Sequence, residues 1–280
     1  MIAAWLRRCR AGCIKSMLLV VLVLTGNSQA DEQKHSIRIT KLDGSFESAS
    51  EVSVDADRRT ITVAKQSLSL DDIRRIHFQR ASSEPVTNTK SERAKAEIQL
   101  RDGSLLVAEK ISVSNDTCHF AMPPSEGLKL ELDQVAAMKL GNTDLTASKF
   151  EAEIARRDRQ LDRLFVANGD AVTPLDGYLE ALQDGAVRFE WMNEIRELPI
   201  DRLRAVVFAT GPTGVFKPDR FKVQLRNGSR LNVSSLATSQ LKSDSADSYI
   251  RVTTRMGATL DIPNSLLSVI ESRSSRLMYL

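Results

Sequence analysis

The chain has 280 residues, of which 42% are hydrophobic and 27% are charged, with only 13 Gly and 8 Pro. This composition is typical of a folded protein and excludes a disordered tail or a fibre. The formal charge is +3, but residues 1–30 contain no acid and four bases, which are Arg7, Arg8, Arg10 and Lys15. Without these four of the thirty-nine bases, 35 bases face 36 acids, a net charge of −1. A nearly neutral surface predicts no nucleic-acid partner.

The first thirty residues have the pattern of a signal peptide. The basic stretch that ends at Lys15 precedes an apolar run over residues 17–24, and the small residues Ser28 and Ala30 follow at the positions that a signal peptidase recognises. The run is about half as long as the roughly 20 apolar residues that a spanning helix needs. We therefore predict a signal peptide over 1–30, a periplasmic or extracellular location, and no stable membrane span after removal of the leader.

Cys118 is the one cysteine that remains after the leader. A single thiol forms no internal disulfide, so the stability of the fold must come from packing. Cys118 and Phe120 alternate as strand residues do, which favours a buried side chain over a nucleophile or a metal ligand.

A turn sequence recurs four times at intervals of 59, 66 and 59 residues between its glycines. An aliphatic residue stands five positions before each glycine, namely Ile39, Ile98, Leu164 and Val223. Asp-Gly and Asn-Gly pairs between alternating apolar residues predict tight hairpins with type I′ turns. The four turns are Asp43-Gly44-Ser45, Asp102-Gly103-Ser104, Asn168-Gly169-Asp170 and Asn227-Gly228-Ser229.

A second signature follows each turn. It runs from Leu70 to Phe78, from Leu132 to Leu140 and from Ile200 to Phe208 with identical spacing, and in looser form from Ile262 to Ile270. We interpret it as a strand end, one short helical turn and a closing strand, with the helical turn capped by a carboxylate. The capping residues would be Asp71, Asp133 and Asp201.

These patterns predict an all-β fold of four tandem, small, five-stranded barrel-like units, whose layout resembles Sm-like proteins. One connecting α-helix is expected between units two and three, with Ser148 and Glu151 as a capping box and Phe150, Ile154 and Leu161 on one face. The expected organisation is signal peptide 1–30, unit one 31–80, linker 81–95, unit two 96–140, helical connector 141–162, unit three 163–210, linker 211–220, unit four 221–272 and tail 273–280.

The stretch from Arg163 to Asp170, continued by Val206-Val207-Phe208, carries a family resemblance. It resembles the β-repeat region found upstream of the NPCBM domain, a carbohydrate-binding module, in secreted bacterial proteins. The tail 270–280 looks like the segment that leads into that module, and the module itself is absent or truncated in this sequence. The resemblance implies a cell-envelope or extracellular setting with polysaccharide as the general partner, and it transfers no catalytic residue.

The sequence contains no nucleophile elbow, zinc helix, phosphate loop or calcium loop. We therefore expect no catalytic residue, no metal and no cofactor, and the best candidates for stacking on a sugar are Trp191 and Tyr178. The resulting hypothesis is a non-enzymatic exported scaffold or binding stalk associated with envelope or extracellular polysaccharide or with other envelope proteins. Two alternatives stay open: an accessory region of a secreted carbohydrate-active enzyme, and a self-assembling cell-envelope protein. The sequence leaves the ligand, the packing of the units and the oligomeric state undecided.

Overall fold

The structure is a computed structural model, which describes residues 36–63, 65–79, 96–123, 125–141, 147–156, 160–169, 171–183, 185–211, 215–239 and 248–273. The predicted signal peptide 1–30 and the linker 81–95 lie outside these residues. Every described element belongs to one compact unit, residues 34–280.

The all-β prediction is confirmed: the described chain consists of antiparallel strands and one short α-helix. Repeat one contains β1 (Ser36–Lys41), β2 (Phe46–Ala49), β3 (Val52–Asp55), β4 (Thr60–Val63), β5 (Gln66–Ser69), the 3₁₀ turn η1 (Leu70–Asp72) and β6 (Ile73–Gln79). Repeat two contains β7 (Ala96–Leu100), β8 (Leu105–Ala108), β9 (Lys110–Ser114), β10 (Thr117–Met122), β11 (Ser125–Glu131), η2 (Leu132–Gln134) and β12 (Val135–Leu140).

The second half of the chain holds two further repeats with a similar order of strands, although repeat four has no 3₁₀ turn before its last strand. Repeat three contains β13 (Asp162–Asn168), β14 (Ala171–Gln183), β15 (Ala186–Trp191), β16 (Glu194–Pro199), η3 (Ile200–Arg202) and β17 (Leu203–Val207). Repeat four contains β18 (Phe221–Leu225), β19 (Arg230–Thr238), β20 (Tyr249–Thr254), β21 (Thr259–Pro263) and β22 (Leu267–Ser272). The helix α1 (Ala147–Ala155) lies between repeats two and three along the chain.

Within every repeat the first strand pairs with both the second and the last strand. The second strand bends sharply, and in repeats one and two the bend divides it, so that each has six strands instead of five. In repeats three and four the bent strand stays continuous as β14 and β19. Among the described residues no pairing joins the fourth strand of a repeat to its last, so each sheet is open and closed five-stranded barrels are not confirmed.

In repeats one, two and four the predicted turns fall at strand reversals, but their type differs from the expected I′. The turn of repeat three includes Asp170, which lies outside the described residues. In repeat one, Gly44 N–H donates to Lys41 O and Lys41 N–H to Ser45 O, and within this turn the positive φ is that of Gly44, at 85°. This is a type I turn followed by a glycine bulge, because the carboxylate of Asp43 accepts the Ser45 N–H and holds the aspartate at negative φ. Type I′ geometry is found instead at Asn115-Asp116 and Met192-Asn193, where both central residues have positive φ.

The short helical turns occur where the second signature predicts them, but the aspartates do not cap them. Asp71 is the middle residue of η1, and the cap is Ser69, whose hydroxyl accepts the Asp71 N–H at 3.2 Å. Asp133 and Asp201 occupy the same middle position in η2 and η3, where no side chain caps the turn. A three-residue turn has no room for a cap inside it, so the aspartate faces outward, and Asp71 forms an ion pair with Arg59.

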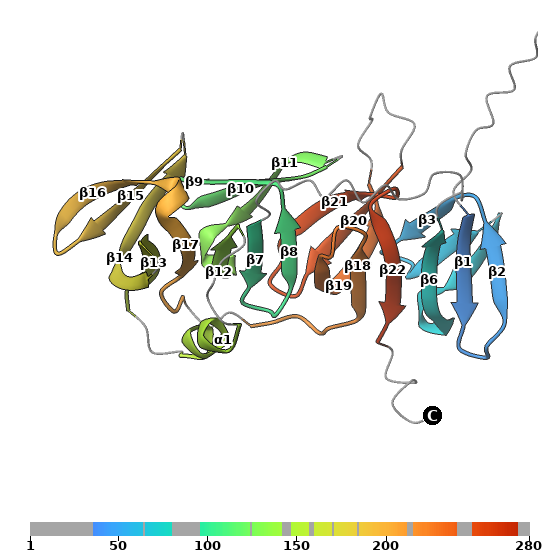
Figure 1. Ribbon diagram of the computed structural model, residues 1–280. Helices are drawn as coiled ribbons and strands as arrows, with labels where there is room; N and C mark the ends of the chain where they lie inside the picture. The colour runs from blue at the N-terminus through green and yellow to red at the C-terminus, as the bar shows by residue number, and fades with distance from the viewer. Residues whose placement is uncertain are drawn as a thin grey trace, which may run out of the picture. The chain divides into compact units, whose positions relative to one another are not determined.

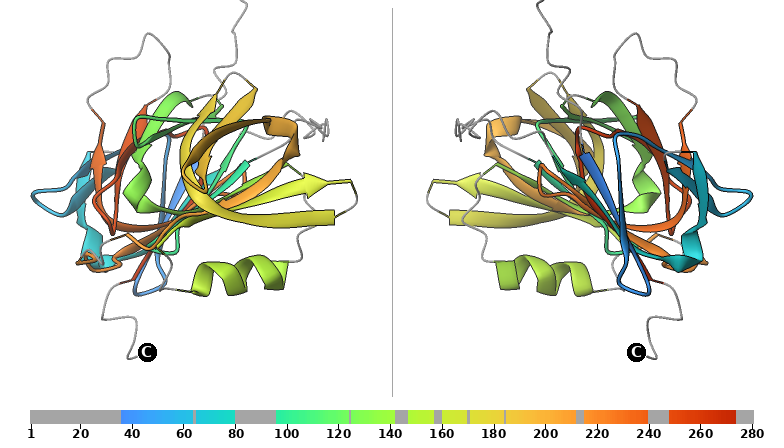
Figure 2. Two further views of the ribbon diagram at one scale, coloured as in Figure 1. Left: turned by 90° about the vertical axis from the view of Figure 1, so that its left-hand side faces the viewer. Right: turned by 90° about the vertical axis from the view of Figure 1, so that its right-hand side faces the viewer.

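The helix forms as predicted but is shorter at its C-terminal end. α1 begins at Ala147, so Ser148 lies inside the helix and is not its N-cap, and it ends at Ala155, so Leu161 falls outside it. Phe150 packs edge-on against Phe165 with ring centroids 6.5 Å apart. Both views of Figure 2 show α1 on one side of the strands.

The four repeats adjoin in the order one, four, two, three, which differs from their order along the chain. The last strand of repeat one, β6, pairs with the last strand of repeat four, β22, and β12 pairs with β17 in the same way. β8 of repeat two meets β19 of repeat four. These neighbours can be followed in Figure 1. The result is one antiparallel sheet that passes through all four repeats.

The two junctions between last strands are related by local twofold symmetry. Ile76 pairs with Ile270, and Met138 pairs with Val206. All four residues occupy the same position of the repeated second signature. Antiparallel pairing of equivalent residues places a twofold axis between them, as in an isologous dimer interface. The repeated units therefore pack in this chain as the subunits of a symmetric oligomer would.

Candidate binding groove

One row of paired residues crosses the centre of the sheet and forms the floor of the candidate site. Gln99 on β7 pairs with Leu105 on β8, Leu105 pairs with Arg230 on β19, and Arg230 pairs with Gln224 on β18. Directly paired residues of neighbouring strands point to the same face of a sheet. Gln99 and Gln224 are equivalent residues of repeats two and four, so the row is nearly symmetric about the Leu105–Arg230 pair.

The helix α1 covers one half of this face and leaves the other half open. Beneath it, Phe150 packs into a small apolar cluster with Ala137, Phe165, Ala205 and Val207. The positions equivalent to Ala137, Ala205 and Val207 at the junction of repeats one and four carry Val269, Arg75 and His77. Two of those three side chains are charged or polar, which explains why no helix of the described chain packs on that half.

A groove of about 790 Å³ lies next to the helix over the junction of repeats two and four. Its floor is the central row with the neighbouring outward residues Glu97 and Lys222, and Phe150 and Glu151 of α1 form part of its wall. The groove is lined by Glu97, Gln99, Gly103, Leu105, Lys139, Phe150, Glu151, Asp219, Lys222, Val223, Gln224, Arg230, Leu231, Asn232, Arg255 and Arg273.

The groove carries an excess of positive charge. Its lining includes five cationic and three anionic side chains. Two of the cations, Lys222 and Arg230, form no ion pair within the described chain. Guanidinium and ammonium groups without an acidic partner are suited to bind carboxylates or other anions. The groove therefore has the charge expected of a candidate anion-binding surface.

Asp219 adds an acceptor to the same groove. One of its carboxylate oxygens, Oδ2, forms an ion pair with Arg273. The other, Oδ1, is buried and accepts no hydrogen bond from the described residues. A buried acceptor without a donor is costly, at about 1–3 kcal/mol. Because Oδ1 has almost no accessible surface, a ligand hydroxyl group could donate to it only after neighbouring atoms move.

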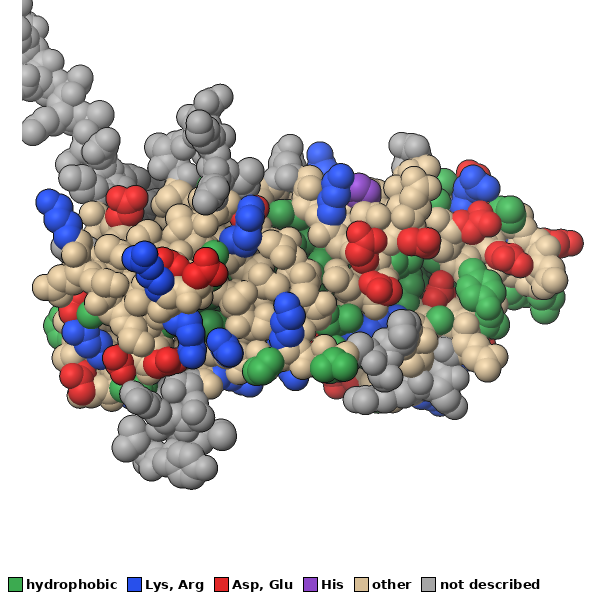
Figure 3. Space-filling view, turned by 180° about the vertical axis from the view of Figure 1, so that it is seen from behind, with side chains coloured by type: hydrophobic (Ala, Val, Ile, Leu, Met, Phe, Trp, Pro, Cys, Tyr) green, Lys and Arg blue, Asp and Glu red, His purple; other side chains and the backbone are tan. Residues whose placement is uncertain are grey.

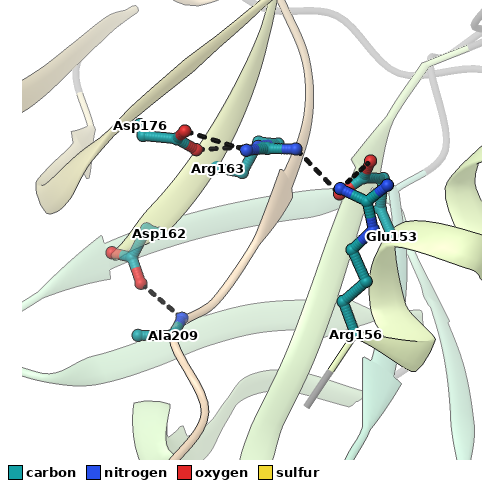
Figure 4. A network of polar contacts seen from close by, with 6 residues as sticks. All are labelled: Glu153, Arg156, Asp162, Arg163, Asp176 and Ala209. Atoms are coloured by element: carbon teal, nitrogen blue, oxygen red, sulfur yellow. Dashed lines mark hydrogen bonds and ion pairs between the residues drawn. The ribbon is translucent and has the colours of Figure 1, made fainter. Parts of the chain in front are cut away.

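A polar network holds α1 against repeat three (Figure 4). The guanidinium group of Arg163 donates to both oxygens of Asp176, at 2.7 and 2.8 Å, and to Glu153 on the helix at 3.0 Å. Arg156 approaches the same Glu153 at 3.4 Å. The carboxylate of Asp176 raises the pKa of Arg163. This network fixes the helix, and with it one wall of the groove.

The two predicted sugar-stacking residues, Trp191 and Tyr178, do not form one platform. Trp191 lies on the same face of β15 as the buried Phe189 and packs partly against the core, with Arg196 stacked 4.8 Å from its ring. Tyr178 pairs with Glu190, which points to the opposite face. Tyr178 is 49% exposed, and Ile195, which pairs with the other side of Glu190, is 59% exposed. Hydrophobic side chains gather toward the right-hand end of the molecule in Figure 3.

The groove was not predicted from the sequence, because its residues come from repeats that are distant along the chain. The turns of repeats two and four carry no distinguishing signal in the sequence, because repeat one has the same pair, Gly44-Ser45. In repeats two and four the turn continues with a serine and, three residues later, with Val107 or Asn232. Ser104 and Ser229 are fully buried although their positions in a turn predict exposure. Their burial marks the junction on which the groove is built.

Cys118 is a buried core residue, as the strand pattern predicts. It lies on β10 with no exposed surface, and burial raises the pKa of its thiol to about 12. The thiol therefore stays protonated at neutral pH and is a poor nucleophile. The free cysteine has the character of a small apolar core side chain.

This pKa predicts both the reactivity of Cys118 and an effect of pH on stability. We expect native chain to react with a disulfide reagent roughly a thousandfold more slowly than unfolded chain, since about three pKa units separate their thiolate fractions. The thiol of the unfolded chain ionises first as the pH rises. The contribution of the protonated Cys118 thiol to the free energy of unfolding is therefore complete below about pH 8.5 and is lost toward pH 12. Denaturant titrations should show this alkaline decline in the native sequence and a smaller one in Cys118→Ala. An equal decline in both proteins would contradict the assignment.

No family model matches this chain, and a search of curated proteins found no match. None of the described helices has the length and apolar character needed to cross a membrane. Within the described ranges, no group of three or more His, Cys, Asp or Glu side chains is arranged to hold a metal ion.

Proposed function

We propose that the chain is an exported, non-enzymatic β-repeat protein that acts as a binding scaffold for acidic polysaccharide of the cell envelope or the extracellular space. The observation that carries the proposal is the groove between repeats two and four. It combines cations that form no ion pair within the described chain, Lys222 and Arg230, with the side-chain amides of Gln99 and Gln224. An acidic sugar offers carboxylates to the first and hydroxyl groups to the second. The export signal predicted over residues 1–30 and the resemblance to β-repeat regions of secreted bacterial proteins support this setting.

The shape and chemistry of the groove suit a chain-like ligand. Its floor presents amide groups of Gln99 and Gln224 on either side of Arg230. Amides both donate and accept hydrogen bonds, so they can recognise hydroxyl groups in either orientation. In every repeat the first strand pairs with the second strand and with the last. This shared pairing supports the further proposal that the four repeats are copies of one Sm-like unit, whose duplication created the groove.

The proposal predicts selective binding of acidic over neutral polysaccharide. The full chain should bind polygalacturonate in affinity electrophoresis and should not be retarded by dextran. Binding should weaken with added salt, because exposed charge interactions are screened over about 10 Å at 0.1 M salt. The double variant Lys222→Gln/Arg230→Gln should lose roughly tenfold in affinity, which corresponds to about 1.4 kcal/mol.

A matched control separates the groove from overall charge. Arg74 and Lys129 are exposed cations on β6 and β11 outside the groove. Arg74→Gln/Lys129→Gln removes the same charge and should change the affinity less than twofold. Equal losses in the two double variants would show that binding is diffuse and would overturn the groove as the site. Release of reducing ends from polygalacturonate by the native chain would overturn the non-enzymatic assignment.

A further inference from the structure

The turns of repeats two and four dock on each other by reciprocal hydrogen bonds. The hydroxyl oxygen of Ser104 accepts the Asn232 N–H at 2.9 Å, and the hydroxyl oxygen of Ser229 accepts the Val107 N–H at 2.8 Å. Each serine stands one residue after its turn glycine, and each donor stands four residues after it. The two contacts are therefore equivalent and are related by a local twofold axis.

A second pair of hydrogen bonds joins the same positions of the two turns, but both bonds are donated by asparagines of repeat four, so this pair is not symmetric. The side-chain amide of Asn232 donates to Asp102 O at 2.9 Å, and that of Asn227 donates to Val107 O at 2.8 Å. On the axis, Leu105 pairs with Arg230, and each stands two residues after its turn glycine. The docked turns thus form a self-complementary contact between β8 and β19.

Repeat one carries the same turn, and no described residue is docked on it. Asp43 Oδ1 accepts the Ser45 N–H at 2.8 Å, as Asp102 Oδ1 accepts the Ser104 N–H at 2.9 Å. A Cβ atom added to Gly44 would meet no atom within 4 Å, whereas one added to Gly103 would meet the amide of Asn232 at 3.4 Å. In the described chain β2 pairs with β1 alone, so its outer edge is open.

Phe46 occupies the position that lies on the twofold axis in the docked pair. It stands two residues after Gly44, as Leu105 and Arg230 stand after their glycines. Its side chain is 59% exposed, and the guanidinium group of Arg38 lies 4.2 Å from its ring. Exposure of a phenylalanine on an open strand edge is typical of an interaction surface. The charged neighbour Glu47 is paired with Lys41 in the same hairpin, at 2.6 Å.

We propose that the repeat-one hairpin binds the same hairpin of a second copy of this chain and forms a twofold homodimer. Its geometry is that of the docked turns of repeats two and four. Ser45 of each copy accepts the Ser48 N–H of the other, and the two Phe46 rings meet on the axis. The contact would continue the sheet that already passes through all four repeats from one copy into the next. This inference is independent of the groove and of the ligand that it binds.

The repeat-three hairpin fits this contact less well. At the serine position its sequence has Asp170, so the hydroxyl group of the docked turns is missing. Its paired arms extend from Asn168 and Ala171 to Asp162 and Gly177, which makes them longer than those of the docked turns. A contact of repeat one with repeat one closes as a dimer, whereas a contact of repeat one with repeat three would continue as a filament.

Sedimentation of the full chain tests the dimer. We expect a reversible monomer–dimer equilibrium at protein concentrations of roughly 1–100 µM, because dissociation constants in this range are common for small interfaces. Phe46→Glu places like charges on the axis and should weaken the dimer at least about tenfold. Ile195→Glu changes an equally exposed apolar residue, 59% exposed, and should leave the equilibrium unchanged. Filaments, a monomer at all concentrations, or equal effects of the two variants would each overturn the proposal.

A cross-link tests the position of the axis directly. In a chain with Cys9 and Cys13 replaced by serine, Phe46→Cys should give a covalent dimer under mild oxidation, because directly opposed strand residues place their Cβ atoms about 5 Å apart. Buried Cys118 leaves no other accessible thiol among the described residues. Ile195→Cys in the same background should stay monomeric on a non-reducing gel. Cross-linking of both variants, or of neither, contradicts the proposed contact, and neither result bears on polysaccharide binding.

Discussion

Replacement of Gly177 by alanine is expected to lower the free energy of unfolding by about 3 kcal/mol or more. An added Cβ atom would lie 2.1 Å from the backbone oxygen of Glu190. Gly177 stands where β14 bends, and the missing side chain lets the backbone of β15 approach closely. The obstacle is backbone, so alanine could be accommodated only by separating two paired strands.

The matched control is Gly211→Ala. This glycine also has no positive φ, and its added Cβ atom would meet the Arg101 guanidinium group at 3.3 Å. A flexible side chain can move aside, so we expect a loss of at most about 1 kcal/mol. Urea titrations followed by circular dichroism measure both variants. Similar losses would show that the approach of β15 to Gly177 does not set the bend.

Removal of the Asp162 carboxylate is expected to be the second most damaging change. Asp162 is 7% exposed and stands at a position that holds Ile37, Ala96 and Phe221 in the other repeats. Its two oxygens accept the backbone N–H groups of Leu179, at 2.8 Å, and Ala209, at 2.7 Å. Figure 4 shows the bond to Ala209. Loss of both acceptors leaves two N–H groups unsatisfied, and Asp162→Ala should cost about 3 kcal/mol.

A graded series distinguishes hydrogen bonding from packing. Asp162→Asn keeps one carbonyl acceptor and should cost about half as much as Asp162→Ala. Asp162→Val has the apolar character of the other repeats but restores no acceptor, so it should remain as destabilised as alanine. Asp176→Ala removes an exposed acid and should cost less than about 1 kcal/mol. A valine variant as stable as the native chain would contradict this role of Asp162.

Local features of the fold were predictable because they depend on neighbours in the sequence. The turns at Gly44, Gly103 and Gly228 and the short helical turns lie where the repeated signatures predict them. The type of each turn was not predictable, since the conformation of an Asp-Gly turn depends on which backbone N–H donates to the aspartate carboxylate. The length of α1 was overestimated for a similar reason: Leu161 matches the helical period, but the helix ends at Ala155.

The candidate binding residues, unlike the turns, could not be predicted from neighbours in the sequence. Trp191 and Tyr178 were selected as aromatic side chains, without knowledge of their faces, and strand alternation around Phe189 places them on opposite sides of the sheet. The groove residues Lys222 and Arg230 are ordinary surface cations in the sequence. They become a site because repeat four packs against repeat two, an arrangement that no local pattern encodes.

Charge at the last strands offers a partial signal for this packing. Across the junction of β6 and β22, Arg75 forms an ion pair with Glu271 at 2.5 Å. If repeat one paired instead with repeat two by the same register, Arg75 would face Lys139, and like charges in directly opposed positions are destabilising. The sequence could therefore have disfavoured one pairing, though not selected the observed one.

The sequence by itself determined the strands, their alternation and the fourfold repetition, because these follow from turn chemistry and from a period of two. The tertiary structure alone decided that the repeats adjoin in the order one, four, two, three. The physical reason is that every last strand offers the same backbone hydrogen bonds, and that the entropic cost of closing a loop grows only slowly with its length. A neighbour distant along the chain is then nearly as accessible as the next repeat, and side-chain complementarity at the junctions makes the choice.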